Sequence, residues 1–72
     1  MRELEKMAKK YKEMYPAGTR IELISMEDPQ AIEPGTKGTV DFVDDAGQIH
    51  MKWDNGRTLA LIPEEDSFKT IR

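Results

Sequence analysis

Two different spacings of hydrophobic residues divide the chain. In residues 2–14 the apolar positions recur every three or four residues among lysines and glutamates: Leu4, Met7, Ala8, Tyr11 and Met14. At 3.6 residues per turn, this spacing places them along one stripe of an α-helix. Pro16 disfavours helical geometry at Tyr15, so the helix should end there. Because so short a helix is marginal in water, its stripe should pack against the rest of the domain or against a second copy.

After Gly18 the apolar residues alternate with polar ones, which is the pattern of half-buried β-strands. We expect five short strands, over residues 19–26, 39–43, 48–53, 57–61 and 68–71. Within the first of them the alternation slips between Leu23 and Ile24, which predicts a β-bulge or a bend.

Glycine, proline and asparagine mark the connections between these strands. A polar loop at 27–33 contains one candidate for burial, Ile32, and 34–38 should form a turn with proline and glycine at its two central positions. Asn55-Gly56 predicts a tight hairpin, because both residues tolerate positive φ. Residues 62–67 predict one turn of helix that begins at Pro63.

These elements predict a mainly β fold: a small five-stranded barrel preceded by one N-terminal α-helix. Residues 16–72 are too few for a seven-stranded sandwich of about 100 residues, whereas a five-stranded closed barrel fits. We therefore expect a single domain with an amphipathic helix at 1–15 and a barrel at 16–72. Its expected core is Ile21, Leu23, Val40, Phe42, Ile49, Met51, Trp53, Leu59, Leu61 and Phe68. The helix should cover an open side with Leu4, Met7 and Tyr11.

The composition narrows the class of protein. A chain of 72 residues forms one domain with a small core. It has no cysteine, which excludes disulfides, thiolate zinc sites and thiol catalysis and fits a reducing compartment. The N-terminus is too charged for a signal peptide, and no apolar run approaches the roughly 20 residues of a membrane span. We therefore expect a soluble cytoplasmic protein that does not enter a membrane.

The net charge of −3 is unevenly distributed along the chain. Residues 1–15 carry five basic and three acidic side chains, whereas residues 16–72 carry six basic and eleven acidic ones. A helix of charge +2 is thus joined at Pro16 to a β unit of charge −5. The three acidic residues dilute the basic charge of the helix, which disfavours a peptide that targets membranes or nucleic acid.

The order of the expected elements resembles the SH3-like barrel, with its long first loop, tight hairpin and helical turn before the fifth strand. Three motifs are more particular: Gly35-Thr36-Lys37-Gly38-Thr39-Val40, D-x-x-G-x-I-H-x-x-W-D-x-G over 44–56, and Pro63-Glu64-Glu65-Asp66-Ser67-Phe68. They resemble a family of short bacterial and phage proteins classed as a domain of unknown function (domain of unknown function 4314). This resemblance covers residues 15–71 and implies no catalytic residue.

The residues that could carry chemistry do not form a catalytic or metal-binding set. His50 is the only histidine, is expected to point outward, and has no serine or cysteine at triad-like spacing. Asp41, Asp44 and Asp45 lack the alternation of ligands and the terminal glutamate of a calcium loop. No glycine-rich loop has the spacing needed for phosphate. We therefore expect no enzyme activity, no cofactor and no metal.

A small interaction or adaptor module, which binds an unknown protein or peptide, is the function that remains. The candidate binding surface is the long first loop together with the end of the hairpin: Met26, Asp28, Ile32, Trp53 and Arg57. Barrels of this kind hold an extended peptide between loops or add a strand at an exposed edge. Trp53 has two interpretations. The alternation of the strand places it on the buried face, which predicts core packing, but it lies at the strand end, where an indole also forms part of a binding groove.

Two alternative functions stay open from the sequence. The strand entry Gly38-Thr39-Val40 has a looser similarity to KOW-type modules, which often contact RNA or ribosomal and transcriptional proteins. Nucleic-acid binding is disfavoured by the charge of the β unit, unless the helix lysines, Lys37, Lys52 and Arg57 share one face. The other alternative is an acidic inhibitor of the phage type that mimics nucleic acid. Both a monomer and a weak homodimer are compatible with the helix stripe.

Overall fold

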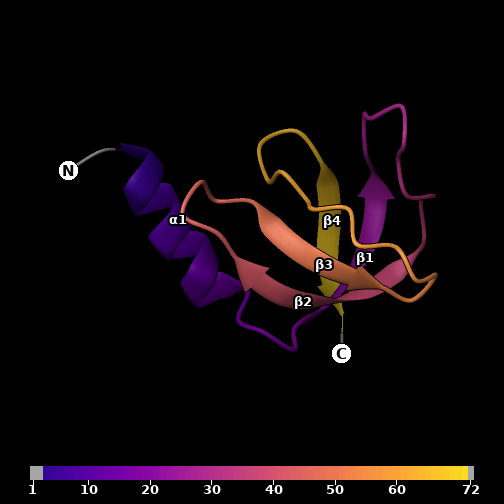
Figure 1. Ribbon diagram of the computed structural model, residues 1–72, viewed down its shortest axis with the longest axis horizontal. Coiled ribbons are helices and arrows are strands. Elements are labelled where there is room, and N and C mark those ends of the chain that lie inside the picture. The colour runs from indigo at the N-terminus through magenta and orange to yellow at the C-terminus, as the bar shows by residue number, and fades with distance from the viewer. Residues whose placement is uncertain (1–2, 72) are drawn as a thin grey trace.

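The computed structural model describes residues 3–71, with side chains from residue 6 onward. One helix and four strands follow one another: α1 (Glu3–Met14), β1 (Arg20–Ser25), β2 (Lys37–Val43), β3 (Ile49–Trp53) and β4 (Ser67–Ile71). The strands form one antiparallel sheet in the order β3-β2-β1-β4, which does not close into a barrel. The helix lies at the end of the sheet where β2 turns into β3, and the long β1–β2 loop lies at the opposite end (Figure 1).

The predicted N-terminal helix is confirmed and packs on its own domain. Ala8 is buried, and Tyr11 and Tyr15 pack against the edge of the core. The Tyr15 ring meets the Phe68 ring edge-on, with centroids 5.5 Å apart. The stripe is incompletely covered, because Met14 is half exposed. The side chain of Leu4 lies outside the described residues, and that of Met7 is half buried.

The slip predicted in the first strand is confirmed. Ile21 and Leu23 are fully buried, and the pairing of β1 with β4 shifts register between Leu23 and Ser25. Ile24 falls at this irregularity and is 51% exposed. The extra residue therefore turns the end of β1 away from the core, as a bulge does.

The prediction that Phe42 belongs to the core is wrong. The pairing of β2 with β3 shifts register between Val40 and Phe42, so the alternation of inward and outward side chains restarts there. Val40 and Val43 are buried, whereas Phe42, which precedes Val43, is 50% exposed. One inserted residue thus exchanges the expected aromatic core residue for a valine.

The predicted fourth strand at 57–61 is also wrong, and with it the closed five-stranded barrel. Only Leu61 pairs with β3, as an isolated bridge to Ile49. The indole nitrogen of Trp53 donates a hydrogen bond to the Leu59 carbonyl at 2.7 Å. Because the buried indole takes this carbonyl, Leu59 makes no backbone bond to Met51, which is its register partner.

The hairpin turn has a different geometry from the one predicted. Gly56 has a φ of 89°, but no residue other than glycine has positive φ in the described chain, so Asn55 does not. The Gly56 N–H donates to the Trp53 carbonyl at 2.9 Å, and the Trp53 N–H donates to the Arg57 carbonyl at 2.8 Å. This is a three-residue hairpin loop with glycine in the left-handed position.

The two other predicted turns are present. The Thr36 N–H donates to the Glu33 carbonyl at 3.1 Å, and Gly35 at the second central position has a φ of 88°. The turn of helix expected at 62–67 is a single hydrogen-bonded turn, in which the Asp66 N–H donates to the Ile62 carbonyl at 2.8 Å. The Asp66 carboxylate accepts in return from the Ile62 N–H at 2.8 Å.

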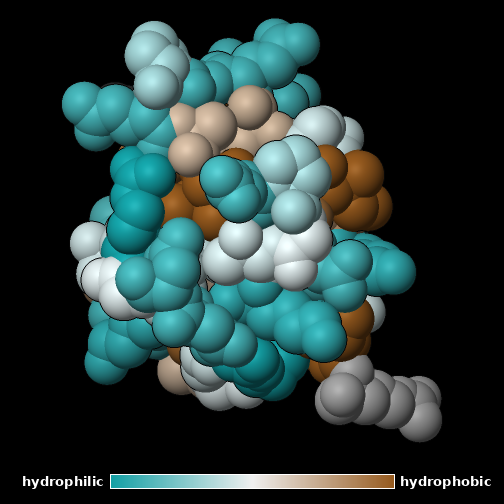
Figure 2. Space-filling view, turned by 90° about the vertical axis from the view of Figure 1, so that its right-hand side faces the viewer, coloured by the Kyte–Doolittle hydropathy of each residue, from teal (hydrophilic) through white to brown (hydrophobic). Residues whose placement is uncertain are grey.

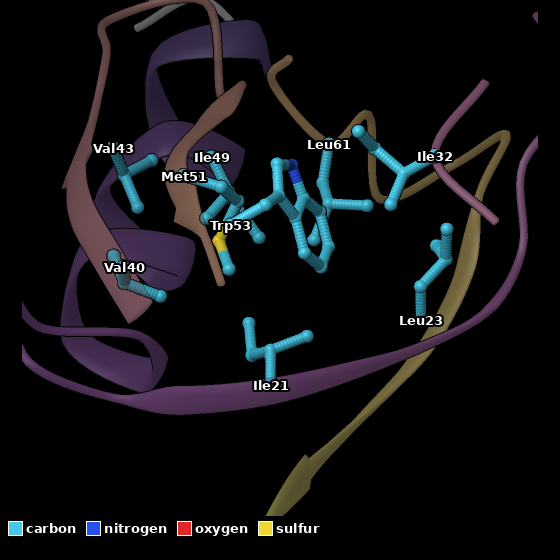
Figure 3. Packing of buried hydrophobic residues seen from close by; sticks show 9 residues of the cluster. All are labelled: Ile21, Leu23, Ile32, Val40, Val43, Ile49, Met51, Trp53 and Leu61. Atoms are coloured by element: carbon cyan, nitrogen blue, oxygen red, sulfur yellow. The ribbon is translucent and has the colours of Figure 1, made fainter. Parts of the chain in front are cut away.

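The core lies on one face of the sheet and includes Ile32 from the long loop and Leu61 from the segment after the hairpin. Its buried members are Ile21, Leu23, Ile32, Val40, Val43, Ile49, Met51, Trp53 and Leu61. Trp53 occupies the middle of this cluster, with Met51 and Ile49 on one side and Leu61 and Ile32 on the other (Figure 3). Leu59 and Phe68, which were also expected in the core, are only partly buried.

Candidate functional site

The five residues of the sequence-predicted surface do not form one exposed patch. Ile32 is 1% exposed and Trp53 is 3% exposed, so neither presents side-chain area to a partner. Met26 is half buried against the core, and only Asp28 and Arg57 are exposed. The interpretation of Trp53 as a half-exposed groove residue is therefore wrong, because its indole fills the core and bonds a backbone carbonyl.

Arg57 ties the hairpin to the long loop. Its guanidinium donates to the carbonyl of Gln30 at 2.6 Å and to that of Ala31 at 3.2 Å. The carboxylate of Asp28 accepts from the Gln30 N–H at 2.7 Å and closes the loop tip. This end of the molecule is largely hydrophilic, with apolar atoms showing in separate places (Figure 2). The loop and the hairpin thus form a polar end of the molecule that is held together by its own hydrogen bonds.

A shallow groove of about 500 Å³ lies beside Arg57. Its walls come from the long loop, from β3 and from the segment that follows the hairpin: Gln30, His50, Gly56, Arg57, Thr58, Leu59 and Ala60. Four of the five residues that were expected to form the fourth strand, 57–60, therefore line the groove. Arg57 is the member of the sequence-predicted surface that lines it.

A cluster of three side chains, Phe42 on β2, His50 on β3 and Asp44 just after β2, lies on the side away from the core. The rings of Phe42 and His50 stack with centroids 4.3 Å apart and planes 8° from parallel. Nε2 of His50 lies 2.8 Å from Oδ2 of Asp44. The aspartate fixes the imidazole, and the imidazole supports one face of the exposed phenyl ring. His50 also lines the groove, so the cluster and the groove are contiguous.

Asp44 is held by more than its contact with His50. Its Oδ1 accepts the backbone N–H groups of Ala46 and Gln48, each at 2.9 Å. Burial is the largest single influence on the pKa of Asp44 and would raise it, but the hydrogen bonds from His50, Gln48 and Ala46 together outweigh burial and lower the pKa. Asp44 is thus held as a carboxylate that orders the β2–β3 loop and the imidazole together.

Comparison with known protein families gives one match. The family model described as Domain of unknown function (DUF4314) matches residues 4–71. The chain belongs to this family. The DUF4314 match begins within α1, so the family includes the helix and not only the β part. No curated protein and no solved structure matches the chain.

The polar residues of the DUF4314-like motifs make contacts within the fold. Asp44 orders its loop, and Asp54 forms two hydrogen bonds with the Arg20 guanidinium, at 2.7 and 2.8 Å. Asp66 accepts from the Ile62 N–H, as described above. Each of these motif positions therefore has a structural role, as expected if the motifs specify the fold.

Sequence reasoning missed Phe42 and Asp44 as members of one surface. A usable signal was present, because Phe42 and Val43 are adjacent apolar residues, and a regular strand cannot bury both. Nothing in the sequence showed which of the two turns outward. The contact of Asp44 with His50 spans six residues and depends on the bulge in β2.

Two further observations concern residues 3–71. They contain no group of three or more histidine, cysteine, aspartate or glutamate side chains arranged to hold a metal ion. Their single helix is too short and too polar to cross a membrane.

The Asp44 site predicts an acid-dependent loss of stability. Because folding lowers the pKa of Asp44, its stabilisation is complete above the ordinary aspartate pKa of about 4 and is lost as the pH falls below it. Asp44→Asn should cost about 1 kcal/mol at neutral pH, since the lost bond to His50 involves a charge, and progressively less as the pH falls below about 4. Urea unfolding at a series of pH values measures this difference.

The matched control for this prediction is Asp45→Asn, which removes one negative charge from the same loop. The Asp45 carboxylate is exposed and contacts Lys12 instead of backbone N–H groups. If wild type and Asp44→Asn differ in stability by the same amount at neutral and at acid pH, the assigned role of the Asp44 carboxylate is wrong.

Proposed function

We propose that this DUF4314 domain is a small non-enzymatic interaction module that binds a protein or peptide partner. The observation that carries this proposal is Phe42, an aromatic side chain that is half exposed on a strand and held in place by stacking on His50. Aromatic residues are enriched in the energetic centres of protein interfaces. An exposed ring of fixed orientation loses little conformational entropy when a partner covers it.

The arrangement around His50 supports binding over catalysis. A histidine paired with an aspartate is also found in catalytic triads, where the second imidazole nitrogen contacts a nucleophile. Within the described residues, the His50 imidazole has one hydrogen-bond partner, the Asp44 carboxylate, and makes no hydrogen bond to a hydroxyl. Its ring face is occupied by Phe42. The imidazole therefore serves to position the aromatic ring.

The SH3-like relationship is part of the same proposal. The order β3-β2-β1-β4, the long loop after β1 and the turn before β4 are consistent with an SH3-like sheet. In this arrangement residues 57–61 lie where the remaining strand of such a fold would be, and they pair with β3 only at their two ends. We propose an SH3-like sheet in which this strand is incomplete, with the groove beside residues 57–60.

Nucleic-acid binding has weaker support from the charges on the sheet. The strands carry four basic residues that could contribute to a phosphate-binding face: Arg20, Lys37, Lys52 and Lys69. However, Arg20 pairs with Asp54, Lys52 lies 4.0 Å from Asp41, and Glu22 lies opposite both Lys37 and Lys69. Tight nucleic-acid binders neutralise about six to ten phosphates. Each of these cations already has a carboxylate near it.

Affinity capture with matched variants tests the proposed function. The tagged full chain, Phe42→Ala and Ile24→Ala are each exposed to a lysate of cells that naturally contain the protein. Ile24 is the control because it is another large apolar side chain that is half exposed, 51% against 50% for Phe42. We expect a protein, identified by mass spectrometry, whose recovery falls about tenfold with Phe42→Ala and stays unchanged with Ile24→Ala.

Binding is then measured with the purified partner by isothermal titration calorimetry. The proposed function is contradicted if wild type and Phe42→Ala capture the same proteins in the same amounts. It is also contradicted if nuclease treatment removes the captured material, since nucleic acid would then be the partner.

A further inference from the structure

Residues 57–61 run beside β3 as an extended segment that is anchored at its two ends. At one end, the Trp53 N–H donates to the Arg57 carbonyl at 2.8 Å. At the other, Ile49 and Leu61 exchange two backbone hydrogen bonds of 2.8 and 2.9 Å. Five residues thus lie opposite the five residues of β3, so the segment is nearly as extended as a strand.

Between these anchors, Thr58 and Ala60 offer backbone groups to the outside. In an antiparallel pair, successive residues direct their N–H and C=O groups to opposite sides, and the Arg57 carbonyl and both backbone groups of Leu61 point to β3. Thr58 is exposed and Ala60 is half buried, and neither backbone makes a hydrogen bond within the described chain. Unpaired groups of this kind are what an added strand binds to.

The groove along this segment has a charge opposite to that of most of the β unit. Among its lining residues, Arg57 is a cation and none is a carboxylate, in a chain with 14 acidic residues. The two bonds from Arg57 to the carbonyls of Gln30 and Ala31 hold the guanidinium beside the groove. A guanidinium has five N–H donors, so donors remain for a carboxylate.

We infer that this groove binds an extended, carboxylate-bearing peptide segment of a partner protein, which adds as a strand along residues 58–60. The main chain of the peptide pairs with the outward groups of Thr58 and Ala60, and its carboxylate pairs with Arg57. This inference rests on the proposed function and names its binding mode. Phe42 stacks on His50, which lines the groove, so the exposed ring lies at the groove edge.

Selection from a random library of linear peptides displayed on phage tests the inference with the purified full chain. We expect enriched sequences to contain more aspartate and glutamate than the starting library. The most enriched peptide is synthesised with a fluorescent label, and its Kd is measured by anisotropy. Its affinity should fall as the salt concentration rises, because a charged pair contributes to binding.

Two proline substitutions locate the added strand. Thr58→Pro removes an outward N–H beside the groove and leaves the Arg57 carbonyl and its bond to Trp53 in place. Thr70→Pro is the matched control on β4, the opposite edge strand, where the pairing alternation turns the Thr70 N–H outward as well. We expect Thr58→Pro to weaken the peptide about tenfold or more and Thr70→Pro to leave its Kd within about twofold.

Arg57→Gln provides the second readout and should weaken acidic peptides about tenfold. The Trp53 indole N–H resonance reports whether each variant retains the core hydrogen bond to Leu59. In folded variants, binding that survives Thr58→Pro, or that is blocked by Thr70→Pro, overturns the inference. Enriched peptides without acidic residues also overturn it. If no peptide is enriched while Phe42-dependent capture of a protein persists, the groove inference fails and the proposed function stands.

Discussion

Replacing Trp53 with alanine is expected to lower the free energy of unfolding by about 3–5 kcal/mol, the largest effect of any single substitution considered. The indole is 3% exposed and lies in the middle of the core cluster, so its removal leaves a large cavity. It also removes the N–H that binds the Leu59 carbonyl at 2.7 Å. A domain of 72 residues has a total stability of about 4–11 kcal/mol, so the variant should be largely unfolded or close to it.

Two control substitutions separate the contributions of Trp53. Trp53→Phe keeps an aromatic ring in the core and loses the N–H, so it should cost less than alanine, about 1–3 kcal/mol. Phe42→Ala removes an aromatic residue that is half exposed and should cost about 1 kcal/mol or less. Trp53 is the only tryptophan, so urea unfolding of all variants should be followed by far-ultraviolet circular dichroism. A larger loss for Phe42→Ala than for Trp53→Ala would contradict the assignment of the core.

Gly38→Ala is expected to lower the stability by about 1–3 kcal/mol through a steric clash. A methyl group on Gly38 would lie 2.8 Å from Cε3 of Trp53 and 3.1 Å from the Lys52 carbonyl oxygen. The φ of Gly38 is not positive, so the backbone itself tolerates alanine. The close approach of β2 to the Trp53 ring is therefore what requires glycine at this position.

Gly35→Ala is the control for this substitution because it separates backbone strain from a clash. A methyl group on Gly35 meets nothing within 4 Å, but the φ of 88° is unfavourable for alanine, which costs about 1–2 kcal/mol. Both variants lose stability, but only Gly38→Ala should shift the fluorescence emission of Trp53. An unchanged emission and an unchanged urea midpoint in Gly38→Ala would show that β2 accommodates the methyl group and that the contact is not tight.

Trp53 connects the core to the proposed binding surface. By binding the Leu59 carbonyl, its indole separates the middle of residues 57–61 from β3. The groove lies along this same segment. Trp53, which the sequence suggested as a residue that contacts a partner directly, thus shapes the binding surface from within the core.

Much of the fold follows from local patterns in the sequence. The helix stripe with Pro16 after it predicts α1, and the alternation through Ile21, Met51 and neighbouring residues predicts β1 and β3. The slip at Leu23–Ile24 was visible because it changes the parity of apolar residues. These features depend on residues close together in the chain, and for that reason periodicity detects them.

The candidate site was less predictable because its contacts depend on tertiary structure. Arg57 was correctly placed on the surface, but Ile32 and Trp53 are buried by packing from distant segments. Phe42 reached the surface through a bulge whose position is set by the pairing of β2 with β3. The parity of a strand is known from its sequence only while its register is regular.

The sequence by itself determined the order of the helix and of the four strands that form, the mainly β class, the small core and the basic helix on an acidic β unit, but it also predicted a strand at 57–61 that does not form. Only the tertiary structure decided that the sheet stays open. Hairpin propensity at Asn55-Gly56 favours a strand at 57–61, but a buried indole must satisfy its N–H, and the Leu59 carbonyl is the acceptor within reach. That requirement of the core competes with the pairing to β3 in the middle of the segment, so residues 57–61 pair with β3 only at their two ends.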